Sequence, residues 1–239
     1  MRVLRRLNDD WMLATEIHKL EARLWRLSQR DKLRVIMITS ADRGEGKSTT
    51  VAYLSTALAL HPDRKILAID LDFRDPRLNS HFELDVPRGL GTVLNGECPL
   101  QEAILKTALP NLDLALPLPT GEDPNLLLRT RELSLIFDWL RQRYDMILID
   151  VPALLPVADA SAVLPFADGV ILMGMAGRTT RPMLTRAREI CVGMDANILG
   201  IIVANLREAT TGYADAGYYY GYRKRRAEVA GSASPKSGT

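Results

Sequence analysis

Residues 35–49 read VIMITSADRGEGKST, a short apolar run that leads through a glycine-containing loop to a lysine and a serine. The apolar residues 35–39 predict a buried strand, and residues 47–60 predict a helix. Glycines between a strand and a helix let backbone N–H groups point at phosphate oxygens, while the lysine reaches the phosphates and the serine binds Mg²⁺. We therefore predict a nucleotide-phosphate site whose binding residues are Gly44, Glu45, Gly46, Lys47, Ser48 and Thr49.

Further apolar runs share the pattern of residues 35–39. They occupy residues 65–70, 146–150, 169–173 and 199–203, and helical candidates lie at residues 159–166 and 183–194. Short, continuous apolar strands that alternate with helices predict a parallel sheet covered on both faces. The fold class we expect is therefore α/β: a P-loop NTPase-type, mostly parallel sheet flanked by helices, in a single domain with a flexible C-terminal tail.

An amphipathic helix is predicted over residues 10–28, where apolar side chains recur at alternating steps of four and three. Such a helix needs an apolar surface, which either its own domain or another subunit would supply. We expect three regions: an N-terminal amphipathic helix region at 1–34, a P-loop nucleotide-binding domain at 35–207, and a Tyr-rich, basic, flexible tail at 208–239.

The composition is that of an ordinary globular chain. Its 239 residues carry a formal net charge of +2 and two cysteines, which argues against a nucleic-acid partner and against a disulfide scaffold. No apolar stretch reaches the roughly 18–20 residues that cross a bilayer, so we expect no transmembrane segment and a cytoplasmic location. The three histidines show no spacing typical of a metal or catalytic site, and we expect His18, His61 and His81 to be ordinary surface residues.

Aspartates follow the predicted strands at the places where a metal site would need them. Asp70 ends the run at 65–70 and Asp72 follows two residues later, and Asp150 ends the run at 146–150. Mg²⁺ takes oxygen ligands and commonly bridges nucleotide phosphates. Aspartates also end strands simply as solvated loop starters, but three of them beside a phosphate loop favour a Mg²⁺ site.

The chain carries a longer series of motifs in a fixed order. They are Thr39-Ser40, residues 44–50, residues 69–77 with an Arg-x-Pro-Arg, residues 89–91, 94–96, 118–121, 124–125, 144–145, 149–152 and 159–160. This series resembles the bacterial tyrosine autokinases of capsule and exopolysaccharide synthesis, which are relatives of the Min-system and plasmid-partition ATPases. The resemblance covers about residues 16–207.

The resemblance implies an ATP- and Mg²⁺-dependent protein-tyrosine kinase. By resemblance, the catalytic residues are Lys47, Asp70 and Asp72, the metal ligands are Ser48, Asp72 and Asp150, and Asn205 is an adenine contact. Asp70 would help to activate the tyrosine hydroxyl. The resemblance also implies a homo-oligomer and a membrane-bound modulator of the polysaccharide co-polymerase type, which would recruit the protein to the inner face of the cell membrane.

A tyrosine cluster lies near the end of the chain, between residues 213 and 222. It consists of Tyr213, Tyr218, Tyr219, Tyr220 and Tyr222, in a Gly-rich and otherwise polar segment. Phosphorylation would add about −1.5 to −2 charges at each site. We expect these tyrosines to be the phosphoacceptors, although a segment that docks on a partner would have a similar composition.

Two other functions remain open from the sequence. One is a non-kinase regulatory P-loop ATPase of the polysaccharide machinery, and the other is a Min- or partition-like, ATP-switched assembly protein. By resemblance, proteins of the second type carry a loop of the form Lys-Gly-Gly-x-Gly-Lys. In this chain Asp42 stands where that loop has its first lysine, which argues against this function. The favoured function is a kinase that phosphorylates its own tail in trans and regulates polysaccharide polymerisation or export.

Overall fold

The computed structural model describes residues 1–118, 121–129 and 131–206. The chain separates into a unit of Met1–Ala204 and a remainder that begins at Asn205. The predicted tail at 208–239, with its five tyrosines, lies outside the described residues. The three predicted region boundaries stay a prediction.

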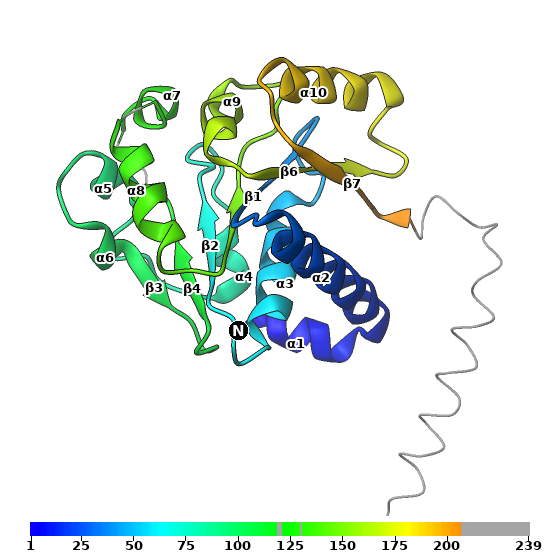
Figure 1. The fold of residues 1–239 in the computed structure, drawn as a ribbon, viewed down its shortest axis with the longest axis horizontal. Helices are drawn as coiled ribbons and strands as arrows, with labels where there is room; N and C mark the ends of the chain where they lie inside the picture. Colours follow the sequence, from blue (N-terminus) through cyan, green and yellow to red (C-terminus); the bar gives the residue numbers. More distant parts are fainter. Residues whose placement is uncertain (119–120, 130, 207–239) are drawn as a thin grey trace, which may run out of the picture. The chain divides into compact units, whose positions relative to one another are not determined.

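The unit of Met1–Ala204 is built around a twisted sheet (Figure 1). Among the described residues, seven strands pair in the order β3-β4-β2-β5-β1-β6-β7, and β3 alone runs antiparallel to its neighbour. Their bounds are β1 Val35–Ser40, β2 Ile66–Asp70, β3 Ile104–Lys106, β4 Leu112–Ala115, β5 Met146–Asp150, β6 Gly169–Met175 and β7 Ile198–Ala204. The mostly parallel sheet is as predicted; β5 is its central strand, and β1 lies between β5 and β6.

Helices cover both faces of the sheet because the strand residues are apolar on both sides (Figure 1). In β1, Ile36 and Ile38 face one core and Val35 and Met37 face the other. The first face carries α1 Arg2–Asp9, α2 Trp11–Asp31, α3 Lys47–Ala59 and α4 Leu78–Phe82. The second carries α5 Leu90–Leu94, α6 Leu100–Ala103, α7 Pro124–Leu127, α8 Arg131–Arg141, α9 Asp159–Val163, the 3₁₀ turn Leu164–Phe166 and α10 Arg181–Gly193.

The amphipathic helix α2 packs against α3 of its own domain. Its Ile17 and Leu24 are buried, and its Glu21, also buried, forms an ion pair with Arg64 before β2. The Arg64 guanidinium also lies 4.1 Å from the centre of the Trp25 ring. The apolar face of α2 therefore packs on its own domain, which is one of the two surfaces that the sequence left open for it.

Some elements differ from the sequence prediction for local reasons. The helix expected over residues 159–166 is divided into α9 and a 3₁₀ turn, because Pro165 has no backbone N–H with which to continue an α-helix. Helix α10 begins two residues earlier than predicted, since the Thr180 side chain caps it by accepting a hydrogen bond from the Met183 N–H. Among the described residues, no helix is long and apolar enough to cross a membrane.

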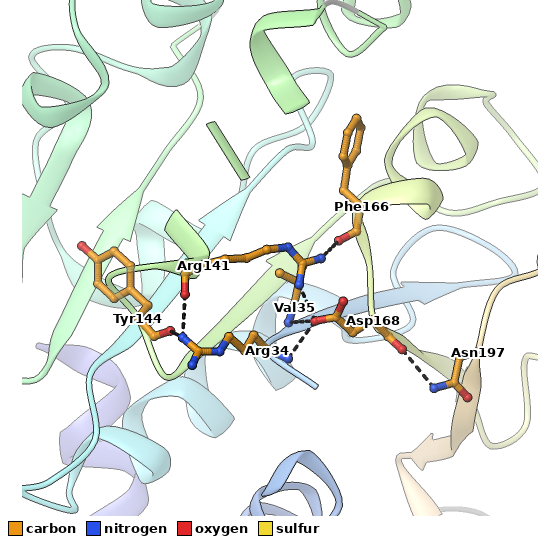
Figure 2. A network of polar contacts seen from close by, with 7 residues as sticks. All are labelled: Arg34, Val35, Arg141, Tyr144, Phe166, Asp168 and Asn197. Atoms are coloured by element: carbon orange, nitrogen blue, oxygen red, sulfur yellow. Dashed lines mark hydrogen bonds and ion pairs between the residues drawn. The ribbon is translucent and has the colours of Figure 1, made fainter. Parts of the chain in front are cut away.

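A polar network holds the starts of β1 and β6 together (Figure 2). Asp168 Oδ2 accepts hydrogen bonds from the Arg34 and Val35 N–H groups at 2.7 and 2.8 Å, and from Arg141 Nη1 at 2.7 Å. Burial alone would raise the pKa of Asp168, but the Arg141 guanidinium and the two N–H groups outweigh it and lower that pKa. The network fixes β1 at the end opposite to its glycine-containing loop.

Candidate active site

The phosphate-binding loop predicted from the sequence lies between the end of β1 and the start of α3. Gly44 and Gly46 have φ angles of +70° and +91°, values that glycine adopts readily and other residues rarely do. Gly46 is the N-cap of α3, so the first turn of that 13-residue helix presents unpaired N–H groups beside the loop. The local geometry is suited to binding an anion.

A cavity of about 390 Å³ opens at this loop. The P-loop contributes Lys47, Ser48 and Thr49 to its wall, and the segment after β2 contributes Asp72 and Arg74. His81 also lines the cavity, and burial lowers its pKa; the expectation of an ordinary surface position is therefore wrong for this histidine. His81 was not predictable as a cavity residue, because its position depends on how the five-residue helix α4 packs beside the loop.

Two of the predicted aspartates are neighbours in the sheet. Asp70 and Asp150 are paired in the register of β2 and β5, and both are fully buried. Burial, and next the charge of Asp70, raise the pKa of Asp150 well above its ordinary value. Neither carboxylate oxygen of Asp150 makes a hydrogen bond of normal geometry to a described residue, although Ser48 lies close enough to lower its pKa. Asp150, like Asp70, does not line the cavity, but it differs from Asp70 in having two buried oxygens without a partner among the described residues.

Asp70 and Asp72 have different surroundings although they are two residues apart. Asp70 accepts N–H hydrogen bonds from Asp72 on Oδ1, and from Arg77 and Leu78 on Oδ2, at 2.9–3.2 Å, and it does not line the cavity. Burial raises the pKa of Asp70 to about 7. Asp72 lines the cavity, and burial raises its pKa against the opposing charge of Lys47. Of these two aspartates, Asp72 is therefore the one that faces the cavity.

Arg74 is fixed at the cavity by a bidentate ion pair. Its Nε and Nη2 atoms lie 2.6 and 3.1 Å from the two carboxylate oxygens of Asp159, which is buried at the start of α9. A second, longer contact of 3.3 Å joins Arg74 to Asp123. The arrangement holds a guanidinium beside the acidic segment after β2, where it balances the charge of the carboxylates.

Glu45, predicted as part of the phosphate-binding loop, is fully buried and does not line the cavity. Its carboxylate accepts a hydrogen bond from the Asp42 N–H at 3.0 Å and another from the Thr179 hydroxyl. Thr179 was not found from the sequence, because it lies 134 residues away and belongs to no motif.

A family model described as an AAA domain matches residues 33–177, which is more than half of the chain. Tyrosine-protein kinase YwqD of Bacillus subtilis is 31% identical over 188 residues, which are 79% of this chain and 78% of that protein. Tyrosine-protein kinase CpsD of Streptococcus agalactiae is 32% identical over 197 residues, covering 81% of this chain and 84% of that protein. The chain belongs to the bacterial tyrosine-protein kinases.

Solved structures that resemble this kinase include other tyrosine-kinase domains. The kinase domain of VpsO has a TM-score of 0.72 and 27% identity, over 82% of this kinase and 97% of that chain. The septum site-determining protein MinD from Pyrococcus horikoshii, in complex with Mg-ADP, has a TM-score of 0.61 and 29% identity, over 71% and 69% of the two chains. The resemblance to tyrosine autokinases found from the motifs is thereby confirmed.

Asn205 was predicted as an adenine contact of this kinase. It follows β7 directly and has a positive φ of +60°, and it belongs to the part of the chain beyond the unit Met1–Ala204. Its role stays a prediction. The predicted phosphoacceptors lie outside the described residues, and the assignment of the tail tyrosines also stays a prediction.

Proposed function

We propose that this kinase transfers the γ-phosphoryl group of ATP to the tyrosines between residues 213 and 222 of another copy of the same chain. The observation that carries the proposal is the cavity in which Lys47, Ser48 and Asp72 meet. A P-loop cation, a metal-binding hydroxyl and a carboxylate in one cavity are what phosphoryl transfer requires.

The donor set fits Mg²⁺. Asp150 offers two buried oxygens without a normal hydrogen bond to the described residues, and Ser48 lies beside it. Within the described residues, no group of three or more acidic, histidine or cysteine side chains could hold a metal ion. Mg²⁺ commonly takes much of its shell from water and nucleotide phosphates. We assign Ser48, Asp72 and Asp150 as the residues that would hold it, and the ion would stabilise charge on the phosphoryl group.

The chemical step would use residues of this chain as follows. Lys47 and the N–H groups of the loop bind the phosphates and hold the γ-phosphoryl group in place. The tyrosine oxygen forms a bond to the γ-phosphorus while the bond between that phosphorus and the bridging oxygen of ADP breaks, and the hydroxyl proton passes to a carboxylate. A phenol with a pKa near 10 is poorly ionised at neutral pH, so a proton acceptor is useful.

We propose that Asp72 receives this proton on the carboxylate oxygen that would not hold the ion. The sequence resemblance implies that role for Asp70, but three backbone N–H groups already occupy the Asp70 carboxylate and keep it out of the cavity wall. Asp70 would instead act as a positioning residue, because its hydrogen bonds hold the segment from Asp72 to Leu78 in place.

From the resemblance we further propose that a membrane-bound modulator recruits this kinase to the inner face of the cell membrane. Modification of the tail would add several negative charges next to the basic residues 223–226. Such a change would alter how copies of the kinase associate with one another and with the modulator. By this route phosphorylation would regulate the polymerisation or export of capsule or exopolysaccharide.

Transfer of radiolabelled phosphate from Mg·ATP tests the proposal. Lys47→Met should abolish labelling of the purified protein, because the phosphates lose their cation. Lys65→Met is a matched control, since Lys65 is an exposed lysine at the opposite end of the sheet, before β2, and it should label like the wild type. Equal labelling of the wild type and Lys47→Met would contradict the assigned chemistry.

A further inference from the structure

We infer that Thr179 is a positioning residue for phosphate binding, which acts through the buried carboxylate of Glu45. In this inference, the turn between β6 and α10 holds the P-loop in the conformation that presents its N–H groups to nucleotide phosphates. The inference rests on the proposed function, because it needs a nucleotide in the cavity.

Glu45 holds the loop from its inner side. Glu45 Oε2 accepts the Asp42 N–H at 3.0 Å, which closes the curve of the loop over three residues, while Glu45 Oε1 accepts the Thr179 hydroxyl. The side chain is fully buried and is absent from the cavity wall. A carboxylate would repel phosphate, so its place inside the loop keeps that charge away from the ligand.

Thr179 is itself held firmly. Its hydroxyl oxygen accepts the Met175 N–H at 2.7 Å, and its own N–H donates to the Met175 carbonyl oxygen at 2.9 Å. The turn also contains Gly177, whose φ is +77°, and the Ala176 N–H donates to the Ala204 carbonyl oxygen of β7 at 2.9 Å. The hydroxyl that meets Glu45 is therefore anchored to the ends of two strands.

The same turn touches the P-loop a second time through Arg178. A Cβ atom added to Gly44 would lie 2.9 Å from Arg178 Nη1, which shows how closely the guanidinium lies against the loop. Arg178 Nη2 is also 3.9 Å from the Asp42 carboxylate. Two neighbouring residues of one turn thus contact the loop at two places.

Glu45 is fully buried, so its carboxylate depends on the hydrogen bonds that it accepts. A buried carboxylate that loses a hydrogen-bond donor is strongly destabilised. Without the Thr179 hydroxyl, the Glu45 carboxylate would turn toward solvent and release the Asp42 N–H, and the loop would lose the curve that its phosphate-binding N–H groups need. Nucleotide affinity would then fall although no group that touches the nucleotide had changed.

The test measures Mg·ADP binding by isothermal titration calorimetry, together with the melting temperature of the nucleotide-free protein. Thr179→Val should weaken binding about tenfold or more, and Thr179→Ser, which keeps the hydroxyl, should bind within about twofold of the wild type. Thr92→Val is the matched control, because the Thr92 hydroxyl bonds the Gly89 carbonyl oxygen at 2.7 Å on α5, away from the cavity. It should leave affinity unchanged even if it lowers the melting temperature.

Several results would overturn the inference. They are wild-type affinity in Thr179→Val, an equal loss in Thr179→Val and Thr92→Val, or no rescue by Thr179→Ser. If Thr179→Val does not fold, Glu45→Met tests the same contact from the loop, and wild-type affinity in that variant would also refute it. A wild-type protein that binds no Mg·ADP would remove the proposed function as well, whereas wild-type binding with unaffected variants removes this inference alone.

Discussion

Asp150 is buried at the end of β5 without a normal hydrogen bond to either carboxylate oxygen from the described residues. Its neighbour in the sheet is another buried carboxylate, that of Asp70. A buried acidic group in such surroundings lowers the stability of the nucleotide-free protein. Functional sites commonly carry such a cost, since the same groups are needed to bind a ligand.

Asp150→Asn should therefore change stability and binding in opposite directions. A neutral amide carries no charge to bury beside the Asp70 carboxylate, so the free energy of unfolding of the nucleotide-free protein should rise by about 1 kcal/mol or more. The dependence of ADP affinity on Mg²⁺ should be lost. Urea denaturation and calorimetry with and without Mg²⁺ measure the two effects.

Asp113→Asn is the control for this prediction. Asp113 is also a buried aspartate in the sheet, but Lys106 and Tyr144 donate hydrogen bonds to its Oδ2 at 2.8 and 2.7 Å, and only its Oδ1 has no partner among the described residues. The control should lower the free energy of unfolding by about 1–3 kcal/mol. A loss of stability in Asp150→Asn as large as that in the control would contradict the account.

The positions of single residues could be predicted from the sequence where those residues belong to a short sequence motif. Lys47, Ser48 and Asp72 belong to motifs in which neighbours in sequence are also neighbours in the site, and all three line one cavity. Thr179 was not predictable, because its contact with Glu45 joins positions 134 residues apart. The hydrogen bonds of Asp70 were not predictable, because they depend on where the backbone N–H groups of residues 77 and 78 point.

Strand β1 is fixed at both ends, by Asp168 at its start and by the P-loop at its end. Asp168→Asn should lower the free energy of unfolding by about 1–3 kcal/mol near neutral pH, because hydrogen bonds to a charged acceptor are lost. Chemical denaturation at several pH values measures the effect. Asp31→Asn, at the exposed end of α2, is the control and should have little effect.

The pH dependence of the Asp168 effect has a definite sign. The pKa of Asp168 is lowered in the folded protein, so its contribution is present above the ordinary aspartate pKa of about 4 and is lost as pH falls through the folded-state pKa. The difference between wild type and Asp168→Asn should therefore shrink below about pH 4. A difference that grows on acidification would contradict the assignment.

Helix α2 depends on its apolar face for attachment to α3. Leu24 is 2% exposed, and Leu24→Ala should lower the free energy of unfolding by about 2–5 kcal/mol, as is typical of buried leucines. Arg23→Ala, at the exposed neighbouring position, should be nearly neutral. Urea denaturation of the two variants measures the difference. Equal free energies of unfolding would mean that α2 does not pack on α3 through Leu24.

Elements were predictable from the sequence in proportion to their length and periodicity. The apolar strands β1, β2, β5, β6 and β7 and the helices α2, α3 and α10 all appear within a few residues of their predicted positions. Strands β3 and β4 have three and four residues, too few for a pattern to emerge. Helix α1 was missed because its sequence is mostly polar and only Val3 and Leu7 are buried.

The arrangement of the whole sheet brings the site together. Because β2, β5 and β1 are adjacent and parallel, the P-loop, the segment after β2 and Asp150 all gather at the carboxyl ends of the strands. The alternation of strands and helices predicted the parallel sheet and its covering layers. The order of the strands was not predictable, because which strands pair depends on contacts between distant parts of the chain.

In the proposed reaction, the active site of one copy phosphorylates the tail of another. A mixing experiment tests it directly: the donor chain has a wild-type P-loop and phenylalanine at all five tail tyrosines, and the acceptor chain carries Lys47→Met with an intact tail. After incubation with Mg·ATP, mass spectrometry should find phosphate on the acceptor between residues 213 and 222, at a rate that rises with donor concentration. An unmodified acceptor tail, beside a wild-type protein that labels its own tail, would contradict transfer between copies.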